Sequence, residues 1–123
     1  MGQIASTPGA AYGVAYSTND YQLAIELTKE LEYVLQTHFG AEGRGLHERV
    51  SSVEIHLPPV TVRTIRYLAS VRNALIHDRN VRCIENRVKF IARFESAMDE
   101  LRVVIDKKAA RNAVDSSSNC VIS

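Results

Sequence analysis

The sequence predicts an all-α fold, a small antiparallel bundle of four helices. Between about residues 18 and 110, apolar residues recur at spacings of three and four, the pattern of helices that each bury one face. No segment shows the alternation of apolar and polar residues that is typical of a strand. Glycine and proline separate the periodic segments, so short connections are expected to join antiparallel neighbours.

The first helix is expected to begin near residues 18–20, where several side chains can serve as the N-cap. Gly40 is its expected end, because glycine readily adopts the left-handed conformation that closes a helix. Its predicted buried stripe consists of Leu23, Leu27, Leu31, Val34 and Leu35.

A glycine-punctuated loop, residues 40–45, leads to a shorter second helix that ends before Pro58-Pro59. The third helix is expected to begin at this proline pair, since a missing N–H costs little in the first turn. The residues expected to face inward are Leu46, Val50 and Val53 on the second helix, and Ile65, Leu68, Val71 or Arg72, and Leu75 on the third.

Residues 78–80 break the pattern, and a fourth helix is expected from about Arg82 to Ala109. Its predicted inward positions are Ile84, Val88, Ile91, Phe94, Met98, Leu101 and Ile105.

Length and composition indicate one globular domain with two small appendages. The chain has 123 residues, of which 46% are hydrophobic and 24% charged. Residues 18–110 form the predicted bundle, residues 1–17 a flexible N-terminal arm, and residues 111–123 a flexible C-terminal tail. The net charge of +1 provides no global basic field, so any binding of nucleic acid has to be local.

Several sequence features predict a cytoplasmic protein. The two cysteines do not suggest a disulfide framework, which favours a reducing compartment. We see neither a secretory signal peptide nor a run of 18 apolar residues. No histidine or cysteine spacing indicates a metal site, and no cofactor is expected.

The motif with the clearest chemistry runs from Arg72 to His77, at the predicted end of the third helix. Arginine is a permanent cation whose planar donor fork suits phosphate. Histidine can take or give a proton near neutral pH. Together with Asn73, which directly follows the arginine, these side chains suffice for metal-free cleavage of RNA if they share a cleft.

Residues 68–78 (LASVRNALIHD), followed by a long amphipathic helix, resemble the HEPN superfamily, the higher eukaryotes and prokaryotes nucleotide-binding domains. The signature of that superfamily is Arg-x4–6-His, often with a polar residue directly after the arginine. Residues 39–48 (FGAEGRGLHE) and 57–59 (LPP) also resemble its small stand-alone members. The resemblance spans roughly residues 20 to 108.

The resemblance implies a homodimer in which two motifs face one another, and many members of the superfamily are metal-independent ribonucleases. In that mechanism His77 acts as general base or acid on the ribose 2′-hydroxyl, Arg72 stabilises the charged transition state, and Asn73 orients the histidine or the phosphate. Such an enzyme is expected to be a toxin or defence effector with a neutralising partner protein. Backbone contacts with RNA are expected from Arg66, Arg79 and Arg82.

A structural interpretation stands beside the catalytic one. Arg72 and Asn73 can instead tie the helix end together, with His77 as a C-terminal cap, and Arg72 can pair with Glu48 or another acid of the second helix. The protein is then a non-catalytic interaction module of the same fold.

Both chain ends carry lipidation signals. Residues 1–6 (MGQIAS) fit the N-myristoylation pattern with Gly2 as acceptor, and residues 120–123 (CVIS) fit a prenylation box on Cys120. Two such signals anchor a protein more stably than one. Because both modifications need eukaryotic enzymes, the hypothesis of a lipid anchor on the cytosolic face of a membrane applies only in such a cell.

Overall fold

The computed structural model describes the backbone of residues 16–122 and the side chains of residues 16–112. The described chain contains helices and no strand, so the predicted all-α class is confirmed. The elements are α1 (Asp20–Phe39), α2 (Leu46–Ser52), a 3-10 turn η3 (Glu54–His56), α3 (Pro59–His77) and α4 (Arg87–Ile122).

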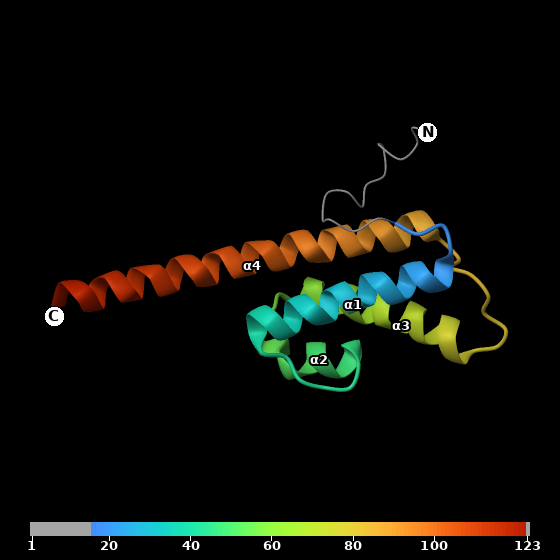
Figure 1. The fold of residues 1–123 in the computed structure, drawn as a ribbon, viewed down its shortest axis with the longest axis horizontal. Helices are drawn as coiled ribbons and strands as arrows, with labels where there is room; N and C mark the ends of the chain where they lie inside the picture. Colours follow the sequence, from blue (N-terminus) through green and yellow to red (C-terminus); the bar gives the residue numbers. More distant parts are fainter. Residues whose placement is uncertain (1–15, 123) are drawn as a thin grey trace.

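The three long helices lie side by side, and α2 lies across one end of α1 and α3 (Figure 1). α4 is much longer than its neighbours, and its C-terminal part extends past the end of α1 (Figure 1). The molecule is therefore a small helical bundle in which α2 is a short cover and not a full-length fourth helix.

The core lies between α1, α3 and the first half of α4. Every inward position predicted for the first two helices is buried, and so are Ile65, Leu68 and Leu75 on α3. Burying a leucine or phenylalanine side chain contributes roughly 1.5–3 kcal/mol, so this cluster supplies most of the driving force for folding. The largest fully buried side chains are Phe90, Phe94, Leu23, Leu27, Leu31, Leu35, Ile65, Leu68 and Leu101.

The predicted ends of α1 and the start of α3 are confirmed. Asn19 is the N-cap of α1, and its Oδ1 accepts a hydrogen bond from the Gln22 backbone N–H at 3.0 Å. Gly40 closes α1 in the left-handed conformation, with φ of 70°, and donates its N–H to the Gln36 carbonyl. Pro59 is the first residue of α3.

The fourth helix differs from the prediction at both ends and at Val88, whereas the predicted inward positions Ile91, Phe94, Met98, Leu101 and Ile105 all lie in the core or pack against it. The helix begins at Arg87 instead of Arg82. Ile84 therefore belongs to the connection between α3 and α4, and its side chain is buried in the core from there. The inward position predicted for Val88 is wrong: its side chain is 79% exposed. Phe90 takes the core position, and because two residues turn a helix by about 200°, Val88 points away from the core.

The buried positions of α4 are therefore Phe90, Phe94, Ala97 and Leu101, with Ile91, Met98 and Ile105 half-buried beside them. The helix also continues to Ile122, beyond the predicted end at Ala109. The core-facing stripe ends near Ile105, and the backbone of α4 continues past the end of α1 (Figure 1).

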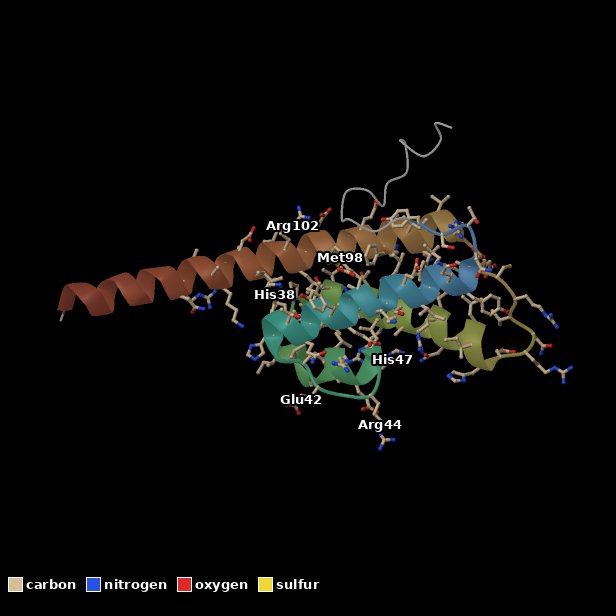
Figure 2. All side chains as sticks on the ribbon, in the orientation of Figure 1. His38, Glu42, Arg44, His47, Met98 and Arg102 are labelled. Atoms are coloured by element: carbon tan, nitrogen blue, oxygen red, sulfur yellow. The ribbon has the colours of Figure 1, made fainter. Side chains whose placement is uncertain are left out.

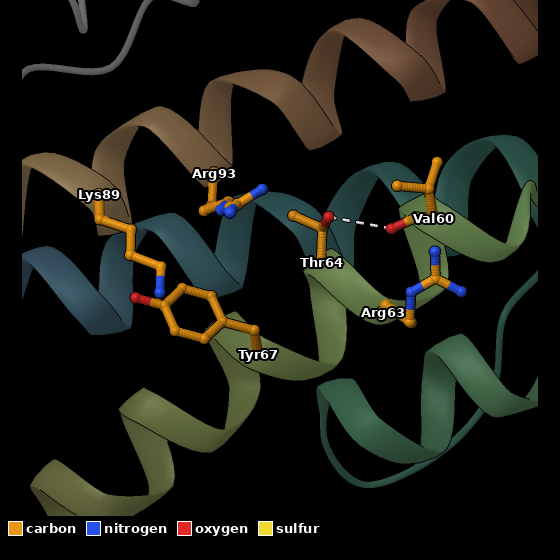
Figure 3. Close-up of a pocket in the computed structure, with 6 residues that line it drawn as sticks. All are labelled: Val60, Arg63, Thr64, Tyr67, Lys89 and Arg93. Carbon is orange, nitrogen blue, oxygen red and sulfur yellow. Dashed lines mark hydrogen bonds between the residues drawn. The ribbon is translucent and has the colours of Figure 1, made fainter.

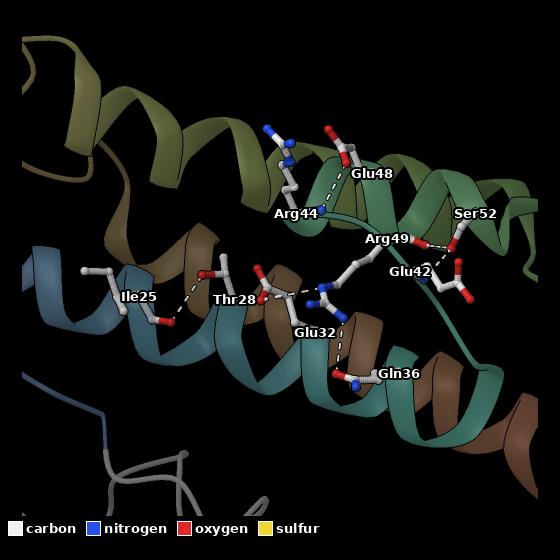
Figure 4. Close-up of polar contacts among 9 residues, drawn as sticks. All are labelled: Ile25, Thr28, Glu32, Gln36, Glu42, Arg44, Glu48, Arg49 and Ser52. Carbon is white, nitrogen blue, oxygen red and sulfur yellow. Dashed lines mark hydrogen bonds and ion pairs between the residues drawn. The ribbon is translucent and has the colours of Figure 1, made fainter.

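Polar side chains hold α2 and its loop against α1 (Figure 4). Arg49 on α2 donates to Gln36 Oε1 at 3.2 Å and lies 3.9 Å from the Glu32 carboxylate. The Glu48 carboxylate accepts the Arg44 backbone N–H at 3.0 Å. Gly43, at φ of 144°, faces Glu48 so closely that an added Cβ would lie 2.5 Å from the Glu48 Cβ. Glycine is therefore required at this turn.

The carboxylate of Asp20 fixes the connection between α3 and α4. It accepts the Ile84 backbone N–H at 2.8 Å and the Arg87 guanidinium at 2.5 Å. Arg87 also donates to the Ser17 carbonyl. Asp20 and Arg87 together thus join the segment before α1, the α3–α4 connection and the start of α4.

We expect Asp20→Asn to lower the free energy of unfolding by about 1–3 kcal/mol, because a neutral amide replaces the acceptor of a charged hydrogen bond that is only partly exposed. Chemical denaturation measures this loss, and hydrogen exchange of residues 79–86 should accelerate. Asp106→Asn, an exposed site on α4, serves as the control. Equal stability of the two variants would contradict the role given to Asp20.

Candidate functional site

The candidate site lies in the last turns of α3, where Arg72 and Asn73 are both half-buried. Arg72 continues the inward stripe of Ile65, Leu68 and Leu75, at spacings of three and four. Its guanidinium Nη1 donates to Asn73 Oδ1 at 3.0 Å. The helical period therefore places the cation of Arg72 at a core-facing position of α3, at the edge of the core, where this side chain is half-buried.

His77 is the last residue of α3 and is exposed. Residues five apart on a helix are separated by about 140° around its axis and about 7.5 Å along it. Arg72 and His77 of one copy therefore point to different sides of α3. Asn73 and His77, four apart, are neighbours on one face.

Asn73 is the connecting residue of the motif. Its carbonyl oxygen accepts from Arg72, which leaves its amide nitrogen as the donor on the face it shares with His77. The three side chains thus form a sequence of neighbours, arginine to asparagine to histidine. Asn73 thus engages one nitrogen of the guanidinium, while the imidazole stays accessible to solvent.

The three arginines predicted to bind RNA are divided between two places. Arg79 and Arg82 are exposed in the α3–α4 connection, directly beyond His77. Arg66 lies roughly 16 Å before His77 along the helix axis, since each residue adds about 1.5 Å. Its guanidinium donates to Ser51 Oγ at 3.0 Å and to Glu54 at 3.2 Å. The structure places Arg79 and Arg82 near the end of α3, and it directs Arg66 toward α2 and η3.

The pairing of Arg72 with an acid of α2 is not found among the described residues. Glu48 accepts from the loop backbone, and the ion pairs of the described residues include Arg49–Glu32, Arg66–Glu54 and Arg87–Asp20. The hydrogen-bond partner of Arg72 is its neighbour Asn73.

The other histidines lie apart from the motif. His38 is in the last turn of α1 and His47 is on α2 (Figure 2). His47 Nε2 lies 3.5 Å from Ser70 Oγ, and His56 is exposed at η3. In the described part of the chain, no three histidine, cysteine, aspartate or glutamate side chains form a group that could hold a metal ion.

The structure shows a basic hollow that the sequence reasoning missed. It lies between α3 and α4, has a volume of about 360 Å³, and is lined by Val60, Arg63, Thr64, Tyr67, Lys89 and Arg93 (Figure 3). Two pairs of residues four apart, Arg63 with Tyr67 and Lys89 with Arg93, carried the signal in the sequence. Each pair lies on a single helix, so the sequence pattern does not show that the two pairs face one another between α3 and α4.

The groups predicted to carry lipids lie outside the described residues. Gly2 lies outside the described residues, and so does the side chain of Cys120. Among residues 16–122, no helix has a stretch long and apolar enough to cross a membrane.

Comparison with known proteins gives no relative. No protein-family model, curated protein or solved structure matches the chain.

Proposed function

We propose that this protein is a HEPN-like, metal-independent endoribonuclease that acts as a homodimer. The observation that carries the proposal is the hydrogen bond from Arg72 to Asn73 one turn before the exposed His77. A rigid phosphate-binding cation and an accessible proton-transfer group are the two parts that cleavage without a metal requires.

The reaction is an internal transesterification. The imidazole of His77 takes the proton of the ribose 2′-hydroxyl as the oxygen attacks the adjacent phosphorus. The bond to the 5′-oxygen breaks, and the imidazolium gives its proton to that leaving oxygen, which yields a 2′,3′-cyclic phosphate and a 5′-hydroxyl. The Arg72 guanidinium stabilises the charge that develops on the phosphoryl oxygens. The need for a 2′-hydroxyl explains a choice of RNA over DNA.

The geometry of α3 supports a site shared by two copies. Because Arg72 and His77 of one helix point to different sides, a twofold-related copy is the simplest source of the missing partner. Ile76, adjacent to His77, is 41% exposed and offers apolar surface for such a contact. A bundle of this size has a modest core, so burying more surface in a dimer also favours its stability.

A ribonuclease of this kind acts in the cytoplasm, where its substrate is. A toxin or defence effector with this activity requires a neutralising partner protein. Arg79 and Arg82, exposed beyond the end of α3, are placed to contact the RNA backbone beside the reacting phosphate.

We expect purified protein to cleave single-stranded RNA in the presence of EDTA, and His77→Ala to lower the rate by about 10²–10⁴-fold, the usual contribution of a general acid or base. Gel analysis of end-labelled RNA measures the rate, and the products should carry cyclic phosphate ends. His56→Ala removes another exposed imidazole and is expected to cleave as the unchanged protein does.

Equal cleavage by His77→Ala and the unchanged protein would remove the proposed base. Loss of cleavage in EDTA with recovery on adding a divalent cation would contradict a metal-independent mechanism.

A second candidate function is a non-catalytic interaction module tethered to a membrane. The observation that favours it is that Asn73 satisfies Arg72 within the helix, so the half-buried guanidinium has a structural use without RNA. The two end motifs supply the tether, on the cytosolic face of the membrane.

Intact mass after expression in a eukaryotic cell tests this tether. The candidate predicts added mass for a myristoyl group at Gly2 and a prenyl group at Cys120, with loss of each in Gly2→Ala and Cys120→Ser respectively. An unmodified mass at both ends would eliminate lipid anchoring.

A further inference from the structure

The hollow between α3 and α4 concentrates positive charge on a nearly neutral protein. Arg63 comes from α3, while Lys89 and Arg93 come from α4, and no acidic side chain is among the residues that line the hollow. Within residues 16–112, none of these three cations forms an ion pair. With a net charge of only +1 for the chain, three unpaired cations in one hollow form a local anion-binding surface.

The aromatic side chain of Tyr67 lies beside the Lys89 ammonium in this hollow. The half-buried Tyr67 ring packs on α3, and the Lys89 ammonium lies 5.1 Å from the ring centroid (Figure 3). Thr64 bonds its hydroxyl to the Val60 carbonyl, so the polar part of the α3 wall is held in place. Cations around an aromatic face are the combination with which proteins hold single-stranded nucleic acid, since bases stack on the ring and phosphates pair with the cations.

The hollow continues toward the candidate catalytic site. A second hollow of about 480 Å³ shares Tyr67 and Lys89 with the first and adds Val71, Ile84, the amide of Asn86 and one carboxylate, that of Glu85. Val71 directly precedes Arg72, and Ile84 belongs to the connection that carries Arg79 and Arg82. The two hollows thus form one groove, called here the α3–α4 groove, that leads from Arg63 to the end of α3.

We propose that the α3–α4 groove binds a single-stranded RNA segment, with Arg63, Lys89 and Arg93 on its phosphates and Tyr67 stacked on a base. The choice of RNA over another polynucleotide rests on the proposed function, whereas binding of a single strand rests on the groove alone. A strand fits better than a membrane surface, because the cations come from two helices that face one another across a concave surface and do not project from one flat face.

The test measures binding separately from cleavage. Every variant carries His77→Ala, so the RNA is not cut, and fluorescence anisotropy follows a labelled single-stranded RNA of about ten nucleotides. We expect Arg63→Gln with Arg93→Gln to weaken binding at least tenfold, and Tyr67→Leu to weaken it roughly five- to a hundredfold, the range for one stacked base. Lys107→Gln with Arg111→Gln, which removes the same charge from exposed positions elsewhere on α4, is expected to have little effect.

Salt dependence provides a second measurement. Three phosphate contacts on a single strand predict that affinity falls about 18-fold between 50 and 200 mM salt, whereas the one contact left in the Arg63 and Arg93 double variant predicts a fall of about threefold. Because Arg63 and Arg93 are exposed, the double variant should fold, and circular dichroism checks this.

Equal weakening by the two double variants, or no binding by the His77→Ala protein, would overturn the proposal. So would binding to vesicles of anionic lipid that depends on Arg63 and Arg93 without binding to RNA. If RNA binds through the groove but protein with His77 intact does not cut it, the groove stands and the proposed cleavage fails.

Discussion

The period of the α-helix in α3 is the constraint on which the site depends. At 3.6 residues per turn, Arg72 continues the buried stripe, Asn73 lies beside it, and His77 emerges one turn beyond Asn73. The helix thus separates the guanidinium, held by Asn73, from the imidazole, open to solvent. The proposal of a shared site follows from this separation, because the helical period turns Arg72 and His77 of one copy toward different sides of α3.

The rest of the fold supports this helix end from two sides. Asp20, at the start of α1, fixes the α3–α4 connection through Ile84 and Arg87. The phase of α4 is set by Phe90 and Phe94, which are fully buried, and this phase turns Lys89 and Arg93 toward α3. The same packing that completes the core therefore creates the α3–α4 groove, whose lining includes Val71, the residue directly before Arg72.

The helices were predictable because their signals are local. The leucine stripe of α1, the glycine at position 40 and the proline at position 59 each act within a few residues, and the structure confirms all three. The start of α4 and the exposure of Val88 were not predictable in this way. Val88 fits a helical spacing as well as Phe90 does, and the choice between them is made by contacts with α1 and α3.

The motif residues were recognisable from their chemistry, but their partners were not. The sequence permits Arg72 to bond either to Asn73 or to an acidic side chain of α2 such as Glu48. The packing of α2, in which Glu48 accepts from the loop backbone, decides between these two partners. The same packing explains why Arg66, close to the motif in sequence, is held at Glu54 instead. Each wall of the groove has a local pattern of residues four apart, but the two walls lie about 25 positions apart in the sequence, so no local pattern reveals that they face one another.

A subunit-mixing experiment tests the shared site most directly. Arg72→Ala and His77→Ala proteins are each expected to be inactive, and exchange of their subunits restores one intact pair of Arg72 and His77 in each mixed dimer. After random exchange of equal amounts, about half of the dimers are mixed, and each mixed dimer has one intact site out of two. The account therefore predicts recovery of about a quarter of the original cleavage rate. Mixed dimers that form and stay inactive would contradict it.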